Sequence, residues 1–265
     1  METVPSPSTP PLPALRPGDQ PARDARFTVV DRWAHCANLP EDHPHKAIEF
    51  LNRQMNEELN VLENASRSLV DFPDADWGLR MWLARQCSDE ARHVQTYRRA
   101  LEQRGGRVGQ FPVMNFQYRI LSNIKDLIGR LAVQNRTFEA DGLDAAVFGV
   151  EDARRSGDHD LAAVYEQQQA DEVLHVRFAN DWVREQIMKD PRSALRMAAA
   201  LSMASQEFQK VMAGGGTSVT KYGVDTQARL EAGFAPGEVE VAANLAEERR
   251  LRVLAAEKAA AAVGQ

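Results

Sequence analysis

The chain has 265 residues, of which 43% are hydrophobic and 26% charged. This balance is typical of a globular protein with one ordinary core and excludes a disordered or fibrous chain. The net charge is −6 without a long block of Lys or Arg, so no nucleic acid is expected as a partner. No apolar run of about 18 residues and no secretory signal are visible, so we expect a cytoplasmic protein without a membrane span.

The N-terminal residues 1–26 contain seven of the 13 prolines. Such a composition cannot bury a core, and it predicts a disordered tail. The two cysteines cannot form a disulfide framework. One of them lies in a short group that lacks the paired ligand spacing of a zinc site, so we expect this group to form a loop. The group consists of His35, Cys36, His43 and His45.

From residue 46 to residue 188, apolar residues recur every three or four positions and prolines are scarce, which predicts four long helices. They are expected at 44–70, from 74–76 to the glycines at 105–106, at 118–155 and at 158–189. The connection before the third helix can cross about 40 Å when extended, enough to run the length of a bundle. Further helices are expected at 192–212 and, after a glycine-rich linker, at 236–262.

These elements predict an all-α fold, because strand-like alternation is weak throughout the chain. The four long helices would form a bundle over residues 27–190, with a long crossover between its second and third helices. The remaining residues, 191–265, would form a helical extension. One of its helices has a mixed charge face that could pack against a second copy, so a homodimer is possible.

The pattern Asp-Glu-x-x-His-Val occurs twice, at 89–94 and at 171–176. A glutamate and a histidine three residues apart lie on one helical face, where both can bind one metal ion or a close pair of ions. Glu90 and His93 form the first such pair, and Glu172 and His175 form the second. Because the chain has only six histidines, the repetition indicates a built site.

The other two helices should each supply one carboxylate at the same level. Glu139 and Glu58 lie at the centre of apolar stripes, where an ionised carboxylate is costly unless something pairs with it. The segments that start at these two glutamates also align with each other, so the chain looks internally duplicated. Glu57 and Glu63 remain competitors for the position on the first helix.

Four glutamates and two histidines in this order resemble the ligands of the ferritin-like superfamily, over residues 46–188. The resemblance implies a ferritin-like four-helix bundle with a carboxylate-bridged centre of two iron ions, or of manganese and iron. Glu58 and His93 would serve one metal, and Glu139 and His175 the other. Glu90 and Glu172 would bridge the two ions.

Residues next to these ligands are candidates for orienting them. Asp89 and Asp171 would each reach the histidine of the opposite motif and fix its tautomer, and Arg92 would pair with a neighbouring acid. An amide precedes each glutamate by four residues and could orient carboxylates or substrate; the four are Gln54, Gln86, Asn135 and Gln168. Tyr97 follows His93 by one turn and is the candidate catalytic residue, as a proton or electron donor.

The resemblance implies an O2-activating oxidoreductase of the oxygenase, hydroxylase or desaturase type, with O2 as co-substrate. Such an enzyme needs a small-molecule substrate and an electron donor. Small residues after Glu139 could leave room for the substrate. The alternative is a protein like ferritin or rubrerythrin that oxidises and stores iron or removes peroxide. The extension beyond the bundle and the absence of Cys-x-x-Cys weigh against it. A scaffold with a vestigial metal site is a third possibility.

Overall fold

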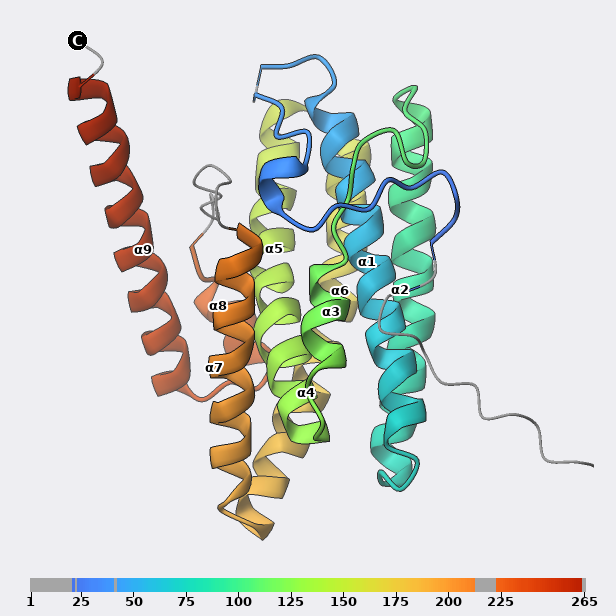
Figure 1. The fold of residues 1–265 in the computed structure, drawn as a ribbon, viewed down its shortest axis with the longest axis vertical. Coiled ribbons are helices and arrows are strands. Elements are labelled where there is room, and N and C mark those ends of the chain that lie inside the picture. The colour runs from blue at the N-terminus through green and yellow to red at the C-terminus, as the bar shows by residue number, and fades with distance from the viewer. Residues whose placement is uncertain (1–20, 22, 41, 213–222, 264–265) are drawn as a thin grey trace, which may run out of the picture.

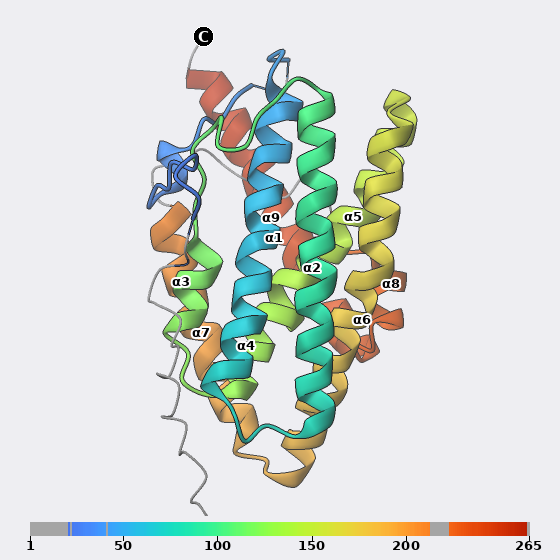
Figure 2. The same ribbon diagram turned by 90° about the vertical axis from the view of Figure 1, so that its right-hand side faces the viewer.

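The computed structural model describes residues 21, 23–40, 42–212 and 223–263. Most of the predicted tail and the glycine-rich linker therefore lie outside the described residues. Four long helices pack side by side, as Figures 1 and 2 show. They are α1 (Lys46–Asp71), α2 (Trp77–Gln103), α5 (Glu139–Ser156) and α6 (His159–Lys189). The all-α prediction is confirmed for the described residues, whose only strand-like pairing is an isolated bridge between Val29 and Val113.

Shorter elements and a C-terminal group of helices complete the fold. A 3-10 turn, η1 (Trp33–His35), lies in the segment before α1, which is otherwise a loop as expected. The others are α3 (Phe116–Ser122), α4 (Leu127–Val133), the π-helix η2 (Gln134–Phe138), α7 (Ser193–Met212), α8 (Thr226–Glu231) and α9 (Pro236–Val263). None of the helices in the described part of the chain is long and apolar enough to cross a membrane.

Side-chain caps and glycine turns set the ends of the long helices where the sequence places them. Asp76 caps α2 by accepting a hydrogen bond from the backbone N–H of Leu79 at 2.9 Å. Asp158 caps α6 in the same way through Leu161 at 3.0 Å. Between α5 and α6, Gly157 adopts a left-handed conformation with φ of 77°, which residues with a Cβ atom rarely reach.

The prediction of one continuous helix over 118–155 is wrong. The chain breaks after α3, and Asp126 then caps α4 by accepting a hydrogen bond from Gly129 N at 2.8 Å. After α4, η2 has the wider turn of a π-helix and leads directly into α5 at Glu139. Local hydrogen bonds of Asp126 stabilise the break, because an aspartate is a better N-cap than an interior helical residue.

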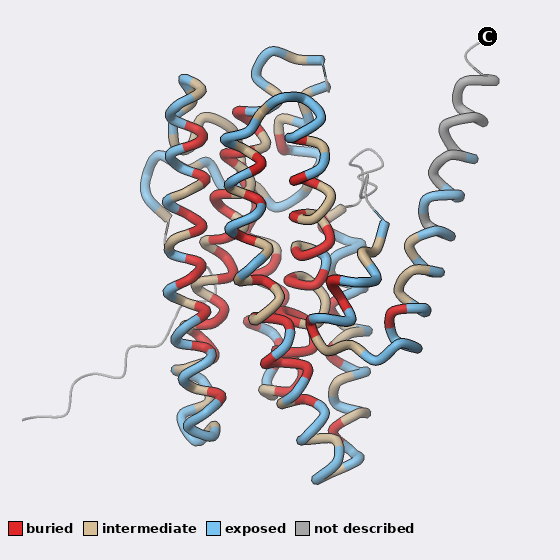
Figure 3. The backbone as a smooth tube through the Cα atoms, turned by 180° about the vertical axis from the view of Figure 1, so that it is seen from behind, coloured by how far each residue is buried: buried red, intermediate tan, exposed pale blue. Residues whose placement is uncertain are grey.

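The sequence analysis also missed the short helix α8, which ion pairs hold against α5. Arg229 of α8 is buried and contacts Asp144 at 2.6 Å and Asp141 at 2.9 Å. Beyond α8, helix α9 stands away from the bundle (Figure 1) and carries mostly exposed or half-exposed side chains in its described first half (Figure 3).

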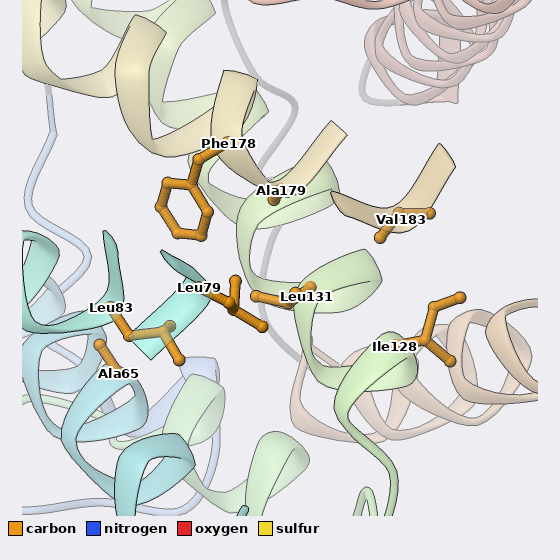
Figure 4. Packing of buried hydrophobic residues seen from close by; sticks show 8 residues of the cluster. All are labelled: Ala65, Leu79, Leu83, Ile128, Leu131, Phe178, Ala179 and Val183. Atoms are coloured by element: carbon orange, nitrogen blue, oxygen red, sulfur yellow. The ribbon is translucent and has the colours of Figure 1, made fainter. Parts of the chain in front are cut away.

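Two apolar layers lie at different heights inside the bundle. The first brings together small and large side chains of α1, α2, α4 and α6 (Figure 4): Ala65, Leu79, Leu83, Ile128, Leu131, Phe178, Ala179 and Val183. The second contains Leu51, Met55, Val94, Tyr97 and Leu101 of α1 and α2. Glu58 of α1 and Glu90 of α2 lie between these two layers along their helices, so hydrophobic packing borders the polar cluster on both sides.

A stripe of buried asparagines on α1 fixes the path of the crossover that leads from α2 to α3 (Figure 2). The stripe repeats every four residues: Asn52, Asn56, Asn60 and Asn64. Asn52 donates to the carbonyl of Phe111 at 3.0 Å, and Asn56 to that of Met114 at 2.9 Å. Asn60 accepts from Tyr118 N at 3.4 Å, and Asn64 donates to Gln134 at 2.7 Å. The stripe thus satisfies backbone groups that the crossover buries.

Candidate metal centre

Six buried side chains from the four long helices converge in the middle of the bundle. They form two overlapping sets, each with all ligand atoms within 4.8 Å of one another. The first set is Glu58, Glu90, His93 and Glu172, and the second is Glu90, Glu139, Glu172 and His175. Glu90 and Glu172 belong to both sets. The structure therefore brings the six predicted residues together as two overlapping groups of donor atoms, each of which could hold a metal ion.

Each histidine turns the same ring nitrogen toward the carboxylates. The Nδ1 atom of His93 lies 2.9 Å from Glu90 and 3.5 Å from Glu58. The Nδ1 atom of His175 lies 3.0 Å from Glu90 and 3.5 Å from Glu139. The two rings are 6.2 Å apart. This matching geometry follows from the matching three-residue spacing in the two motifs.

The other ring nitrogen of each histidine contacts an aspartate of the opposite helix, as predicted. His93 Nε2 lies 3.0 Å from Asp171, and His175 Nε2 lies 3.2 Å from Asp89. Arg92 donates to both aspartates, at 2.8 Å to Asp171 and at 2.7 Å to Asp89. One guanidinium group therefore links both aspartates and, through them, both imidazoles. Such contacts orient a histidine and raise its basicity toward a metal.

The four amides differ in what they contact. Gln86 donates to Glu139 at 3.0 Å, and Gln168 donates to Glu58 at 2.8 Å, so each reaches a glutamate across the bundle. Asn135 instead donates to Gln86 at 3.1 Å and to the carbonyl of His175 at 3.2 Å. Gln54 accepts a long contact of 3.4 Å from Arg53. The described contacts thus connect two of the four predicted amides directly to glutamates of the cluster.

A fifth amide, Gln134, was not predicted and donates to Glu139 at 3.0 Å. Gln134 precedes Glu139 by five residues, the hydrogen-bonding interval of a π-helix. The wider turn of η2 therefore places Gln134 beside the carboxylate, where it and Gln86 both donate to Glu139 Oε1 at 3.0 Å. No four-residue pattern in the sequence reveals this contact.

The competing glutamates of α1 point to other partners. Glu57 contacts Arg53 at 3.4 Å, and Glu63 pairs with Arg23 at 2.7 Å. Glu58, only 5% exposed, is the α1 carboxylate that enters the cluster. On a helix, positions i and i+1 diverge by about 100° and positions i and i+5 by about 140°, so Glu57 and Glu63 face away from the side of α1 that carries Glu58.

The donor set fits two divalent cations. Three buried atoms of the cluster make no well-aligned hydrogen bond among the described residues: Glu90 Oε1, Glu172 Oε2 and His175 Nδ1. Two of them, Glu90 Oε1 and His175 Nδ1, lie 3.0 Å apart, so they contact each other and no other partner aligns with them. Buried polar atoms are rarely left unpaired, and buried carboxylates need a compensating charge. Four glutamates carry four negative charges, which two divalent ions would balance with the imidazoles neutral. Oxygen and nitrogen donors of this kind suit iron and manganese.

The charges within the cluster shift the titration of its members strongly. Burial raises the pKa of Glu58 to about 8, and burial together with Glu139 raises the pKa of Glu172. Burial opposes ionisation of Glu90 too, but the charge and hydrogen bond of His175 outweigh it and lower the Glu90 pKa. Burial opposes protonation of His175, yet Glu90 and Asp89 raise the pKa of this imidazole. The buried carboxylates therefore attract protons and other cations strongly.

A cavity of about 360 Å³ adjoins the cluster on its carboxylate side. Glu58, Glu139 and Glu172 form part of its wall, whereas neither histidine does. Tyr97 also lines the cavity, and its hydroxyl donates to Gln168. Burial and the charge of Glu58 raise the pKa of Tyr97, so the phenol keeps its proton at neutral pH.

The fold and the site together define an all-α protein with a buried carboxylate and imidazole cluster that can hold metal ions. Residues 4–240 match the model of a family described as "Protein of unknown function (DUF455)", and the chain belongs to this family. No match to a curated protein or to a solved structure was found.

Proposed function

We propose that the protein is a non-haem di-iron oxidoreductase of the ferritin-like class, which uses O2 to hydroxylate or desaturate a small organic substrate. The observation that supports this proposal most directly is the contact between the six-residue cluster and the cavity. Three of the four glutamates of the cluster line the wall of the cavity, so a bound molecule would lie next to the metal ions.

Two iron ions bound by the six residues would supply the electrons and Lewis acidity that O2 activation needs. The protein's own residues provide the surroundings. Apolar layers enclose the cluster, which limits the access of water. Asp89 and Asp171 hold the imidazoles in one orientation. Because these aspartates and Arg92 cover the histidine side, substrate would approach from the carboxylate side.

The overall reaction requires an external electron donor. Hydroxylation transfers one oxygen atom of O2 into a C–H bond and reduces the other atom to water, which consumes two further electrons and two protons. Desaturation instead takes two electrons and two protons from the substrate, and two more of each still come from outside to reduce O2 to two waters. Tyr97 stands at the cavity wall with its hydroxyl hydrogen-bonded to Gln168, which itself contacts Glu58. We assign Tyr97 the role of a proton donor on this side.

Metal analysis and an O2 reaction test the proposal together. Protein from iron-supplemented cells should contain about two irons per chain. After anaerobic reduction, mixing with O2 should change the optical spectrum within a single turnover and consume O2. Glu58→Gln should impair metal binding, whereas Glu57→Gln, its neighbour outside the cluster, should not. Less than one metal per chain, or no reaction with O2, would refute the proposal. Accumulation of many ferric ions per chain would favour iron storage instead.

A further inference from the structure

Aromatic side chains form much of the wall of the cavity beside the cluster. Phe50 and Tyr165 lie on one part of it, with ring centroids 6.5 Å apart. Phe116, Phe138 and Phe208 form a second group, in which Phe116 contacts each of the others at 5.7 to 5.8 Å. Aromatic walls favour flat, apolar ring systems through stacked or edge contacts. A cavity of about 150 Å³ accepts benzene, so about 360 Å³ has room for a molecule with two fused rings.

Gly142 contributes open space at the cavity wall, one turn after Glu139. A Cβ atom built at Gly142 would meet no atom within 4 Å. Glycine inside a helix costs about 1 kcal/mol relative to alanine, and neither a close neighbour nor a positive φ requires it at this position. The missing side chain instead widens the cavity beside the glutamate. This is the place where a bound molecule would come closest to the second set of ligands.

The charged groups of the wall outside the cluster already have partners. Arg53 lies between Glu49 and Glu57, at 3.4 Å from each, and Asp141 contacts Arg229 at 2.9 Å. A charged ligand would have to displace one of these partners or remain unpaired, which is costly inside a protein. The wall therefore favours an uncharged molecule.

One polar group of the wall still needs a hydrogen bond. Gln117 lines the cavity and is 8% exposed, and its Oε1 atom has no hydrogen-bond partner among the residues that the structure describes. An amide oxygen accepts hydrogen bonds but cannot donate them. A ligand with an N–H or O–H group would satisfy it, whereas a purely hydrocarbon ring would leave it unpaired.

We infer that the cavity binds an uncharged, flat aromatic molecule of one or two rings that carries an N–H or O–H group, which donates to Gln117 Oε1. As the identity of a substrate, this inference rests on the proposed di-iron function; as a binding site, it does not. The aromatic residues provide the ring contacts, and Gly142 leaves space next to Glu139. Gln117 selects molecules that can donate a hydrogen bond.

Calorimetric titration of the full-length protein, with and without bound metal, tests the inference with four related probes. Indole carries the N–H group, and 1-methylindole lacks it at nearly the same shape. Indole should bind about 5- to 30-fold more tightly than 1-methylindole, the range expected for one buried acceptor that is satisfied or left unpaired. Tryptamine and indole-3-acetate, which add a positive and a negative charge, should bind at least about 10-fold more weakly than indole.

Two variants test the hydrogen bond to Gln117 and the open space at Gly142 separately. Gln117→Leu should reduce the preference for indole over 1-methylindole to less than about 2-fold, because the acceptor is gone. Gly142→Leu should abolish indole binding by filling the cavity. It should not lower the melting temperature, since a Cβ atom at this position meets no neighbour within 4 Å, the rest of the side chain extends into the cavity, and leucine favours the helix. Gly142→Ala is the matched control, with a small loss of affinity.

Each result supports or overturns the inference. Equal affinity for indole and 1-methylindole, tighter binding of either charged probe, or binding unaffected by Gly142→Leu would overturn it, as would no binding of any probe. Failure of the proposed function would look different. Indole would then bind with the predicted selectivity to a protein that takes up no iron or does not react with O2.

Discussion

In the hairpin formed by α1 and α2, Glu58 lies on an uninterrupted helix, whereas Glu139 in the second half follows directly after a π-helix. The two halves nevertheless present the same carboxylates and imidazole to the cluster. The two halves differ in the residues that surround the cluster. Arg92 contacts both aspartates from α2, while Leu174 occupies the corresponding place on α6. Only the second half holds α8 through a buried arginine. The shared residues thus define the site, and the unshared ones support it in different ways.

The largest effect is expected from the two glutamates that both sets share. Glu90→Ala or Glu172→Ala should reduce the metal content from about two ions to well below one per chain, because each removes a donor from both positions. Glu58→Ala and Glu139→Ala each affect one set and should leave about one ion. Elemental analysis measures the difference. Equal losses in all four variants would contradict two overlapping sites.

Removal of the metal should lower the stability of both halves together. A chelator should reduce the melting temperature by about 5–15 °C, which corresponds to ~3–4 kcal/mol for a tightly bound ligand in a chain of this size. The physical reason is that the four buried glutamates then lack compensating charge. The control is Glu90→Ala, whose melting temperature the chelator should leave unchanged. A chelator that has no effect on the metal-loaded protein would show that the metal does not stabilise the fold.

A buried ion pair attaches helix α8 to the second half of the bundle. Arg229→Met removes the partner of buried Asp144 and should destabilise the protein by about 3 kcal/mol at pH 8, measured by urea unfolding. Arg98→Met is the control, because the contact of Arg98 with Glu102 is exposed and should contribute less than about 0.5 kcal/mol. Similar effects of the two substitutions would contradict a special role for the buried pair.

The cost of Arg229→Met should also depend on pH. Burial raises the pKa of Asp144 to about 6 although Arg229 opposes the shift. Without the arginine, the folded-state pKa of Asp144 rises further. Above pH 6 the folded variant therefore retains a proton that the wild-type protein has released, so its relative stability falls as the pH increases. The difference should be smaller at pH 5, where Asp144 is largely protonated in both proteins.

The smallest expected effect comes from Arg92, the cation that the second half lacks. Arg92→Leu copies the residue of the second motif and leaves Asp89 and Asp171 without their shared donor. We expect a loss of about 1 kcal/mol in stability and about 10-fold in metal affinity, measured by unfolding and by competition with a chelator. Arg85→Leu serves for comparison, since Arg85 contacts Asp89 at 3.4 Å but not Asp171. An equal loss in both variants would exclude a linking role of Arg92.

The sequence predicted the long helices and the members of the cluster because both follow from helical periodicity. Aspartate caps, glycine turns and the repeated motif are local signals, and four parallel stripes leave little choice about which residues meet. The break near Asp126 and the π-helix escaped prediction, since Ile124, Ile128 and Leu131 continue the apolar spacing across them. The ligand role of the six clustered residues stays a prediction, which metal analysis of the variants tests.

Other contacts could not be predicted because they depend on three-dimensional packing. Gln134 reaches Glu139 only through the wider turn of η2. Helix α8 has six residues, too few for a periodic pattern, and Arg229 meets Asp144 across 85 residues of chain. Such pairs depend on how the segments pack in three dimensions rather than on local preference.

The asparagine stripe on α1 has a consequence for the tolerance of the chain to insertions. The crossover residues Phe111, Met114 and Tyr118 each meet an asparagine in successive turns of α1. An extra residue between 111 and 118 would move at least one of them out of line and leave buried backbone groups unpaired. At Gly105, by contrast, a positive φ marks an open turn with no neighbour within 4 Å of a Cβ atom. Chains with an added segment should therefore fold when the addition is made directly after Gly105 and fail when it is made between 111 and 118.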